Sequence, residues 1–438
     1  MMKSERRRVF PCSAGENGRT MNTIEKVFVP ADILLPGDAD MSKWAVVACD
    51  QFTSQPEYWK RAAQTVGDSP TALKLILPEA YLEAADVDKR IGAIHKNMEH
   101  YLELGIFEEY KNSFLLLERT DSTGKLRLGL VGAVDLEKYD FSKGSVSPVR
   151  ATEATVAERI PPRLKVRRGA ALELPHIMIL IDDPEMTVIE PLDKNKDGYR
   201  KVYDFELMEG GGRAAGYILD GKAAEQAENA LGRLAQRLSD GDPHPLVFAM
   251  GDGNHSLATA KEYYEELKRQ NPGKDMSRHP ARYALAEITN LHSEALQFEA
   301  IHRIITGVDT KRLLDEMTED LKLSEDIIPG AQSFEWVCGG DIKRFCIGKT
   351  SSVLTVGSVQ NFLDGYISRN GGKIDYIHGA EVVKELALQE NSAGILLPDM
   401  AKSELFPTVK KDGALPRKTF SMGHAEDKRY YIEARRIK

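Results

Sequence analysis

Apolar residues follow two spacings along the chain, and the alternation between them predicts a mixed α/β fold. Short apolar or alternating runs, typical of strands, fall at 44–50, 75–82, 113–120, 126–136, 176–185, 246–250, 282–290, 344–348, 352–357, 393–400 and 428–437. Apolar positions three or four residues apart, which favour helices, occupy 84–104, 222–238, 256–271, 308–324 and 378–390. The run 296–305 fits a strand or the start of a helix. We therefore expect a mixed sheet core with flanking helices.

The glycine run 210–212 has two interpretations. Consecutive glycines can form a loop that cradles phosphate. Here, however, alternating segments flank the run on both sides, which favours a hairpin turn between two strands. We predict the hairpin.

Domain boundaries are weakly marked, because the chain has no fixed-period repeat and no long low-complexity linker. We expect residues 1–20 to be a disordered N-terminal extension, with Met21 as an equally good start. Residues 21–305 should form an α/β core that carries the segment 251–256. Residues 306–438 should form a C-terminal α/β region whose end packs back on that core.

The composition excludes several classes of protein. The net charge of −8 gives no global basic field for nucleic acid or an anionic membrane, so neither partner is expected. No apolar run approaches the roughly 18 residues that span a bilayer. The four cysteines (Cys12, Cys49, Cys338 and Cys346) lack CxxC spacing and favour a reducing cytoplasm. We expect a cytoplasmic protein with a small-molecule substrate, and leave its oligomeric state open.

The segment Gly251–Ser256, with the sequence GDGNHS, carries the most chemistry. It follows an apolar strand and opens a helix, where unpaired backbone N–H groups and the helix dipole favour an anion. Glycines let the backbone approach a phosphate, and Asn254 and His255 can donate to its oxygens. Asp252 can hold a divalent ion or accept a proton. Alternatively, Asp252 and Asn254 form an Asx-type turn and Ser256 caps the helix.

Further candidates lie elsewhere along the chain. Asp50 closes the predicted strand 44–50, a common ligand position in α/β sheets. Basic residues follow Glu153, including Arg159 and Arg163, and could bind an anionic substrate, although such a run is usually a solvated helix face. The chain has no P-loop and no local spacing typical of a transition-metal site.

Several motifs together resemble a bacterial protein family, domain of unknown function 1015. The segment GDGNHS is similar to its Asp-Gly-His-His-Arg loop, and residues 149–185 to its acidic-Thr segment, basic helix and strand ending in Asp-Pro. FEAIHRII at 298–305 is similar to its Thr-His-Arg motif. AGILLPDM and GALPRKTFSMGH, at 393–400 and 413–424, resemble its closing segments. The resemblance spans about residues 25–438, and the family itself is uncharacterised.

The same loop resembles the phosphate-binding loop of the ParB/sulfiredoxin superfamily, which includes free-serine kinases. This resemblance implies a ParB/sulfiredoxin-like loop–helix element. The chain departs from both patterns, because Asn254 replaces the first histidine and Ser256 replaces the arginine. Losing that arginine removes a bidentate phosphate clamp. Arg303, Lys418 or Arg150 would have to supply another cation.

We interpret the chain as an enzyme that transfers phosphoryl to or from a small hydroxyl metabolite such as serine, using Mg²⁺ and a nucleotide, ATP or ADP. The alternative is a non-catalytic ligand-binding or regulatory protein using the same pocket. Asp252 and His255 are the predicted catalytic residues, with Asp252 also holding the metal. The predicted phosphate- and substrate-binding residues are Gly251, Gly253, Asn254, Ser256, Arg150, Glu153, His302, Arg303 and Lys418.

Overall fold

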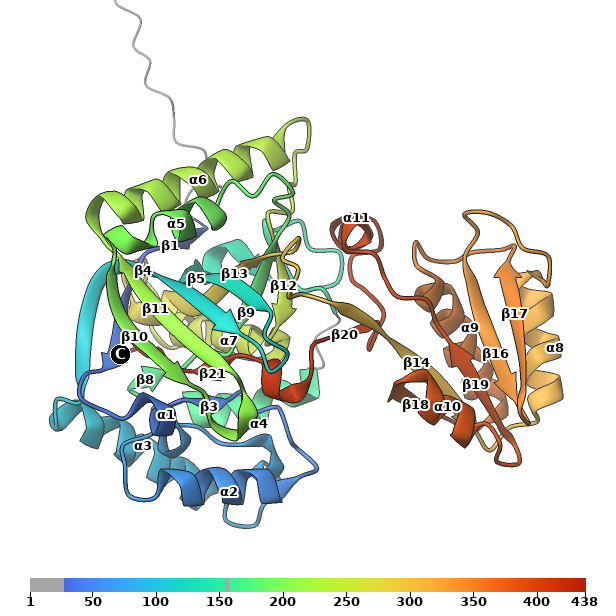
Figure 1. The fold of residues 1–438 in the computed structure, drawn as a ribbon, viewed down its shortest axis with the longest axis horizontal. Helices are drawn as coiled ribbons and strands as arrows, with labels where there is room; N and C mark the ends of the chain where they lie inside the picture. Colours follow the sequence, from blue (N-terminus) through green and yellow to red (C-terminus); the bar gives the residue numbers. More distant parts are fainter. Residues whose placement is uncertain (1–26, 154–156) are drawn as a thin grey trace, which may run out of the picture.

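The computed structural model of the chain describes residues 27–153 and 157–438. The extension expected at residues 1–20 lies outside the described residues. The fold is the mixed α+β arrangement that the sequence predicts, with a larger mixed sheet and a smaller antiparallel sheet (Figure 1). Across 27–153 and 157–438, no helix is both long and apolar enough to cross a membrane.

The larger sheet is built around the hairpin of β4 (Phe107–Thr120) and β5 (Leu126–Asp135). In spatial order its strands are β10 (Arg200–Glu206), β11 (Arg213–Leu219), β4, β5, β13 (Tyr283–Asn290), β9 (Met178–Ile181), β12 (Phe248–Asp252), β7 (Val149–Arg150) and β6 (Tyr139–Asp140). β1 (Phe28–Val29) pairs with β5, and β2 (Ala31–Pro36) with β4. The antiparallel pair β10–β11 confirms the hairpin predicted around the glycine run.

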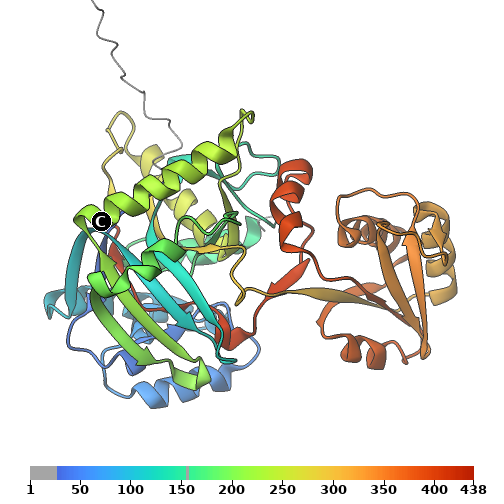
Figure 2. The ribbon, with the colours of Figure 1, turned by 45° about the horizontal axis from the view of Figure 1, so that its top comes forward.

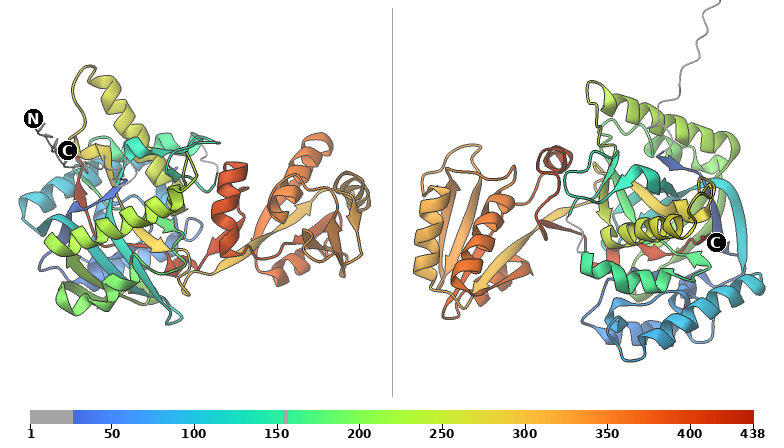
Figure 3. Two further views of the ribbon diagram at one scale, coloured as in Figure 1. Left: turned by 90° about the horizontal axis from the view of Figure 1, so that it is seen from above. Right: turned by 180° about the vertical axis from the view of Figure 1, so that it is seen from behind.

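Helices surround this sheet. They are α1 (Met41–Trp44), α2 (Pro56–Val66), α3 (Val87–Glu103), α4 (Ile160–Arg167), α5 (Glu190–Lys194), α6 (Gly221–Ser239) and α7 (Asn254–Gln270). Figure 1 shows α5 and α6 at the top of the larger unit and α2 and α3 at the bottom. α7 lies behind the strands in that view and comes to the front in the right-hand view of Figure 3, packed against α4.

The smaller sheet runs in the order β15 (Leu323–Ser324), β17 (Asp341–Ile347), β16 (Ser333–Cys338), β19 (Ser392–Leu396), β14 (Phe298–Thr306) and β18 (Lys373–His378), with β20 (Phe420–Met422) beside β14. Its helices are α8 (Thr310–Leu321), α9 (Thr355–Asn370) and α10 (Ala380–Leu386). Figure 2 shows this unit set apart, with β14, β20 and α11 (Leu405–Asp412) between the two bodies. The expected domain division at 305/306 falls inside β14.

The C-terminal segment returns to the larger unit. β21 (Tyr430–Tyr431) pairs with β3 (Val46–Val47), and β22 (Arg435–Arg436) pairs with β8 (Leu172–Glu173). Ala434 exchanges backbone hydrogen bonds with Leu34. Apolar residues between 430 and 437 are therefore part of the hydrophobic core of the larger unit.

A buried ion network fixes this returning segment. Glu287 of β13 lies 3.1 Å from both Arg127 of β5 and Arg429, and Arg429 also pairs with Glu433 at 2.7 Å. Gly129 makes room for it, because a Cβ there would come within 2.5 Å of the Glu287 carboxylate. Because these side chains are buried, removing one of them leaves its partner as an uncompensated buried charge, which is costly.

Two predicted strands are wrong. The segment 75–82 instead contains 3₁₀ turns at Ala72–Leu75 and Glu79–Tyr81. Pro78 lies between them and has no N–H for a strand ladder. The segment 352–357 leads into α9, whose apolar face continues through Val359 and Leu363 at helical spacing. The short apolar run there belonged to a helix.

Candidate functional site

A strand, one glycine and a helix form the centre of the site. β12 ends at Asp252, α7 begins at Asn254, and Gly253 joins them with φ of 78°. The apolar spacing predicted a helix start near Ser256, two residues later than the start at Asn254. Gly253 is required on two counts: its φ is left-handed, and an added Cβ would lie 3.0 Å from the Ile177 Cα. Having no side chain, it leaves the first N–H groups of α7 for other acceptors.

Asp252 is held in place by two contacts. One carboxylate oxygen accepts a hydrogen bond from the Gly253 N–H at 2.8 Å. The other lies 3.3 Å from the Lys428 Nζ, and both side chains are mostly buried. Lys428 thus places a positive charge beside the N-terminus of α7. A cation is expected there because Ser256 replaces the arginine of the family motif.

Glu153 adds a second carboxylate near Asp252. Burial raises its pKa, the charge of Lys418 and a hydrogen bond from the Lys418 backbone oppose the rise, and the charge of Asp252 adds to it. Lys428 also acts on it electrostatically. The structure therefore gathers Glu153, Asp252, Lys418 and Lys428 at one end of β12.

Asn254 opens α7 with an unsatisfied acceptor. Its Oδ1 is buried and finds no hydrogen-bond partner among the described residues. An amide oxygen left bare in a folded protein marks a place where water, a cation or a ligand donor completes the structure.

His255 is a neutral imidazole at pH 7. Burial lowers its pKa to about 4, the positive charges of Arg163 and Arg159 contribute, and Asp50 opposes them. The two arginines come from α4 and the turn before it. Two residues of the basic run after Glu153 thus act on the start of α7, although Arg163 is itself ion-paired with Glu79.

This pKa shift predicts a pH-dependent stability. The folded state resists protonation of His255 below its ordinary pKa of about 6.5, so the unfolded state binds more protons between about pH 6.5 and the folded value of about 4. We expect the free energy of unfolding to fall through this window as pH falls. Urea unfolding at pH 7 and pH 5 should show a smaller loss for His255→Gln than for the wild type. Equal losses would contradict the assignment.

A hydrogen-bonded row of side chains lies on the other side of α7. Ser256 Oγ lies 3.1 Å from His176 Nε2, and His176 Nδ1 lies 2.7 Å from the Tyr431 hydroxyl. The Cys49 N–H donates to that hydroxyl at 3.2 Å. Asp50 lies 3.8 Å from His176 Nε2. Burial alone would raise the pKa of Asp50, but the charge of His176, a hydrogen bond from Gln51 and the charge of Lys428 make the net shift downward.

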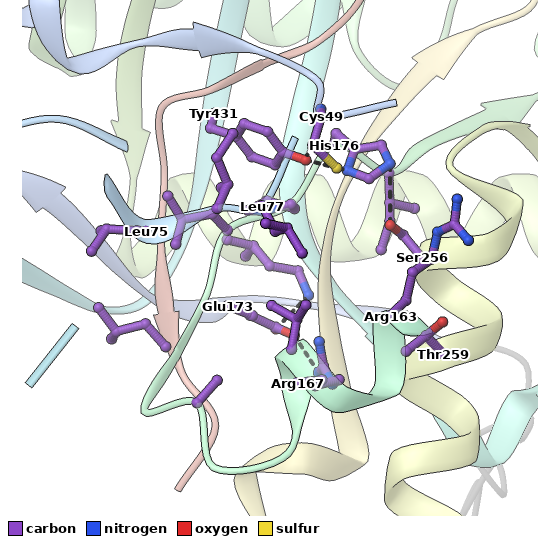
Figure 4. Close-up of a pocket in the computed structure, with 18 of the residues that line it drawn as sticks. Cys49, Leu75, Leu77, Arg163, Arg167, Glu173, His176, Ser256, Thr259 and Tyr431 are labelled. Atoms are coloured by element: carbon purple, nitrogen blue, oxygen red, sulfur yellow. Dashed lines mark hydrogen bonds and ion pairs between the residues drawn. The ribbon is translucent and has the colours of Figure 1, made fainter. Parts of the chain in front are cut away.

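This row closes one end of a cavity of about 140 Å³ (Figure 4). Most of the wall is aliphatic, including Leu75, Leu77, Met98 and Leu172, and Arg163 lies near the Ser256 end in the figure. A cavity of about 150 Å³ with an aliphatic lining is large enough for one benzene ring. The start of α7 therefore joins a charged cluster to an apolar cavity.

Three predicted binding residues are occupied elsewhere. Arg150 donates to the carbonyl oxygens of Ser147 and His244, before the start of β12. Arg303 is fully buried and donates to Gln360 and to backbone carbonyls, including that of Lys418. His302 Nδ1 accepts the Leu397 N–H in the smaller sheet. These bonds anchor the three side chains but engage only some of their nitrogen atoms, so their phosphate contacts stay predictions.

Lys428, His176 and Tyr431 were not among the predicted site residues. Lys428 opens the predicted C-terminal strand, and His176 opens another, so the sequence contained them without showing that they meet. The pairing of β21 with β3 brings Tyr431 and Lys428 beside Asp50. No local spacing encodes that contact.

Comparison with known proteins adds a family. The search of curated proteins returned no match. Among solved structures, a free serine kinase in complex with AMP is similar at 13% identity and TM-score 0.36, over 70% of this chain and 90% of that chain. Staphylococcus aureus SbnI with a C-terminal truncation is similar at 9% identity and TM-score 0.35, over 67% of this chain and 82% of that chain.

A conserved hypothetical protein from Pyrococcus furiosus is similar at 12% identity and TM-score 0.34, over 67% of this chain and 90% of that chain. Such TM-scores say nothing of what the present chain binds. The family described as "Protein of unknown function (DUF1015)" matches residues 34–436. Because that match covers nearly the whole sequence, the chain belongs to this family.

Proposed function

We propose that the protein binds a nucleotide, ATP or ADP, or a phosphorylated metabolite at the start of α7 and transfers phosphoryl to or from a small hydroxyl metabolite such as serine. The observation that carries this proposal is the meeting of Asp252, Glu153 and Lys428 at a helix N-terminus that has no side-chain cap. Cations and carboxylates at one place suit a reaction that binds phosphate and activates a hydroxyl.

Phosphate binding is supported by three sources of positive potential. The first-turn N–H groups of α7 point out of the helix end, where its dipole attracts anions. Lys428 adds an ammonium within 3.3 Å of Asp252. Arg159 and Arg163 act on neighbouring His255. A phosphate here would exchange the Asp252–Lys428 contact for a Lys428–phosphate contact and leave Asp252 available.

The carboxylates supply the acid–base part. Freed from Lys428, Asp252 can take the proton of an attacking hydroxyl. Burial raises the pKa of Glu153, so this carboxyl group holds a proton more readily than an exposed glutamate does. His255 is neutral and can donate to phosphate without adding charge.

Mg²⁺ fits this cluster when phosphate is also present. In residues 27–153 and 157–438, no group of three His, Cys, Asp or Glu side chains could hold a metal by itself. Mg²⁺ ordinarily takes one or two carboxylates together with substrate phosphates and water. Asp252, Glu153 and the unsatisfied Asn254 Oδ1 are suitable oxygens. The ion would neutralise phosphate charge.

A non-catalytic ligand-binding protein is the second candidate. The Asp252–Lys428 ion pair favours it, because a carboxylate engaged by lysine is a poor base. The two functions differ in nucleotide turnover. A protein that binds a nucleotide without consuming it in the presence of hydroxyl metabolites would be a sensor or carrier.

A thermal-shift screen of nucleotides and phosphorylated metabolites, with and without Mg²⁺, tests the proposal. A ligand at 100 times its dissociation constant stabilises the folded state by about 2.7 kcal/mol, which is easily measured. Hits are then incubated with hydroxyl metabolites, serine first, and nucleotide consumption is followed. Absence of any nucleotide or phosphometabolite hit would refute the proposal.

Lys428→Met tests the binding site directly. Losing a charged hydrogen bond to phosphate costs about 1.5–3 kcal/mol, so the dissociation constant of the best hit should rise about 10- to 150-fold. Lys410→Met is the matched control, because Lys410 also pairs with one aspartate, Asp242, at 2.7 Å. Isothermal titration should show unchanged affinity for that control. Equal affinities for both variants would remove Lys428 from the site.

A further inference from the structure

We propose that a second cavity, which shares Lys428 with the α7 site, is a binding subsite for a small oxyanion, the phosphate or carboxylate group of a metabolite. The cavity measures about 70 Å³, and Arg119, Arg127, Lys125 and Lys428 contribute to its wall. It is lined by residues of β4, β5 and the segment 422–428. This inference goes beyond the phosphoryl transfer proposed above and does not depend on it.

Arg119 is the central residue. It is 2% exposed, and it donates to the carbonyl oxygens of Thr120 and Glu426. Its guanidinium also lies 5.4 Å from the centre of the Tyr430 ring. In the described part of the chain it has no ion pair, and its Nε is buried without a hydrogen-bond partner. A buried guanidinium with no carboxylate is costly unless a further anion is present.

A second arginine makes that cost larger. Arg119 on β4 stands directly opposite Arg127 on β5, an arrangement of like charges that destabilises a sheet. Burial lowers the pKa of Arg119 to about 10, and the charge of Arg127 adds to the effect. Arg127 is compensated by Glu287, but Glu287 is shared with Arg429.

The buried charges do not balance. The buried side chains here include three guanidinium groups, Arg119, Arg127 and Arg429, and two carboxylates, Glu287 and Glu433. One buried positive charge is left over: Arg119 forms no ion pair within residues 27–153 and 157–438, and the Asp427 carboxylate of the cavity wall acts on it only electrostatically. An oxyanion in the cavity would restore neutrality.

The acidic residues of the wall do not fill this role. Asp121 uses one carboxylate oxygen to accept the N–H groups of Thr123 and Lys125 at 2.8 Å. Asp427 accepts the Ser122 N–H at 2.8 Å. Glu299 also lines the cavity, but its carboxylate is hydrogen-bonded to His378, which does not. One oxygen of each aspartate is thus held in a turn and Glu299 is held by another side chain, and none of the three forms an ion pair with an arginine of the wall as the structure describes it. The buried Nε atoms of Arg119 and Arg127 are unsatisfied among the described residues.

Size and geometry select the ligand class. A water needs about 10–15 Å³ of such space, so about 70 Å³ accommodates a compact group of a few heavy atoms. Guanidinium groups bind planar carboxylates and tetrahedral phosphates through paired donors. Lys428 connects this cavity to Asp252, so one ligand could present its anionic end here and its reacting group at α7.

The test compares melting temperatures of the wild type and Arg119→Met, each in a low-salt buffer without oxyanions and then with millimolar inorganic phosphate or acetate. Without an oxyanion, removal of the unpaired charge should leave Arg119→Met at or above the wild type. With the bound oxyanion, the wild type should exceed the variant by about 2 °C or more. Phosphate and acetate, compared at equal concentration, identify which group the subsite prefers.

This reversal of rank distinguishes the subsite from anion binding at α7, which both proteins retain. Arg213→Met is the control, since Arg213 lies opposite Thr120 but is half exposed and paired with Asp204. Its rank should not change with oxyanion. If Arg119→Met does not fold, Arg119→Lys should fold and bind at least 10-fold more weakly. An Arg119→Met protein less stable than the wild type in every buffer, or an equal oxyanion shift in both, would overturn the proposal.

Discussion

Replacing Asp252 by asparagine is expected to lower turnover about 100-fold or more while leaving the fold intact. Asparagine keeps the acceptor for the Gly253 N–H but cannot take a proton or bind Mg²⁺ with a full charge. Loss of the mostly buried ion pair with Lys428 should cost about 1–3 kcal/mol, which lowers the urea midpoint without unfolding the protein. Nucleotide consumption and the urea midpoint are measured on the same preparation.

Asp242→Asn is the matched control for this variant. Asp242 accepts the His244 N–H at 2.8 Å and pairs with Lys410, so it repeats both contacts of Asp252 away from the site. Its turnover should equal that of the wild type. A fully active but less stable Asp252→Asn protein would instead make the residue a structural part of the turn.

Glu287→Gln is expected to cause the largest loss of stability. The change removes the carboxylate shared by Arg127 and Arg429. Arg429 keeps Glu433, but the buried Arg127 is left without a carboxylate. Removing one member of a buried ion pair costs about 3–5 kcal/mol. Urea unfolding should show a correspondingly lower free energy of unfolding for the step that includes the larger sheet.

The control for this change is an exposed glutamate. Glu108 pairs with Arg200 at 2.9 Å, and both side chains are about half exposed or more. Glu108→Gln should therefore cost about 1 kcal/mol or less. If Glu287→Gln were no more destabilising than Glu108→Gln, the network would contribute nothing to the returning C-terminal segment.

Elements with a long, regular pattern were predicted well. Apolar spacing in 84–104 and 222–238 predicted α3 and α6, and the apolar runs at 113–120 and 126–136 predicted β4 and β5. Predictions from short apolar runs failed, because a few apolar residues fit both the helical and the strand spacing. The segment 352–357 was read as a strand although it leads into α9, and Trp44–Asp50 contains only the two-residue β3 together with the end of α1.

Only the part of the site that is encoded by neighbouring residues could be predicted. The strand–glycine–helix at Gly251–Ser256 is encoded locally, and so was found. The cation beside Asp252 comes from Lys428, which reaches it through pairing of β21 with β3 across most of the chain. Long-range pairing leaves no periodic signal, so Arg303, Lys418 and Arg150 were proposed from the motifs instead. Lys418 lies in the cluster with Glu153, whereas Arg303 donates to carbonyl oxygens and Gln360.

The return of residues 430–437 to the larger unit has a consequence for biosynthesis. A ribosome that has completed β13 has made every strand of the larger sheet, but not the segment that pairs with β3 and β8. The nascent chain must carry those open positions while the smaller sheet is translated. Lys428 and Arg429 arrive with the same late segment, so Asp252 and Glu287 stay without these partners until then. Folding of the larger unit is therefore completed after, rather than before, synthesis of the smaller one.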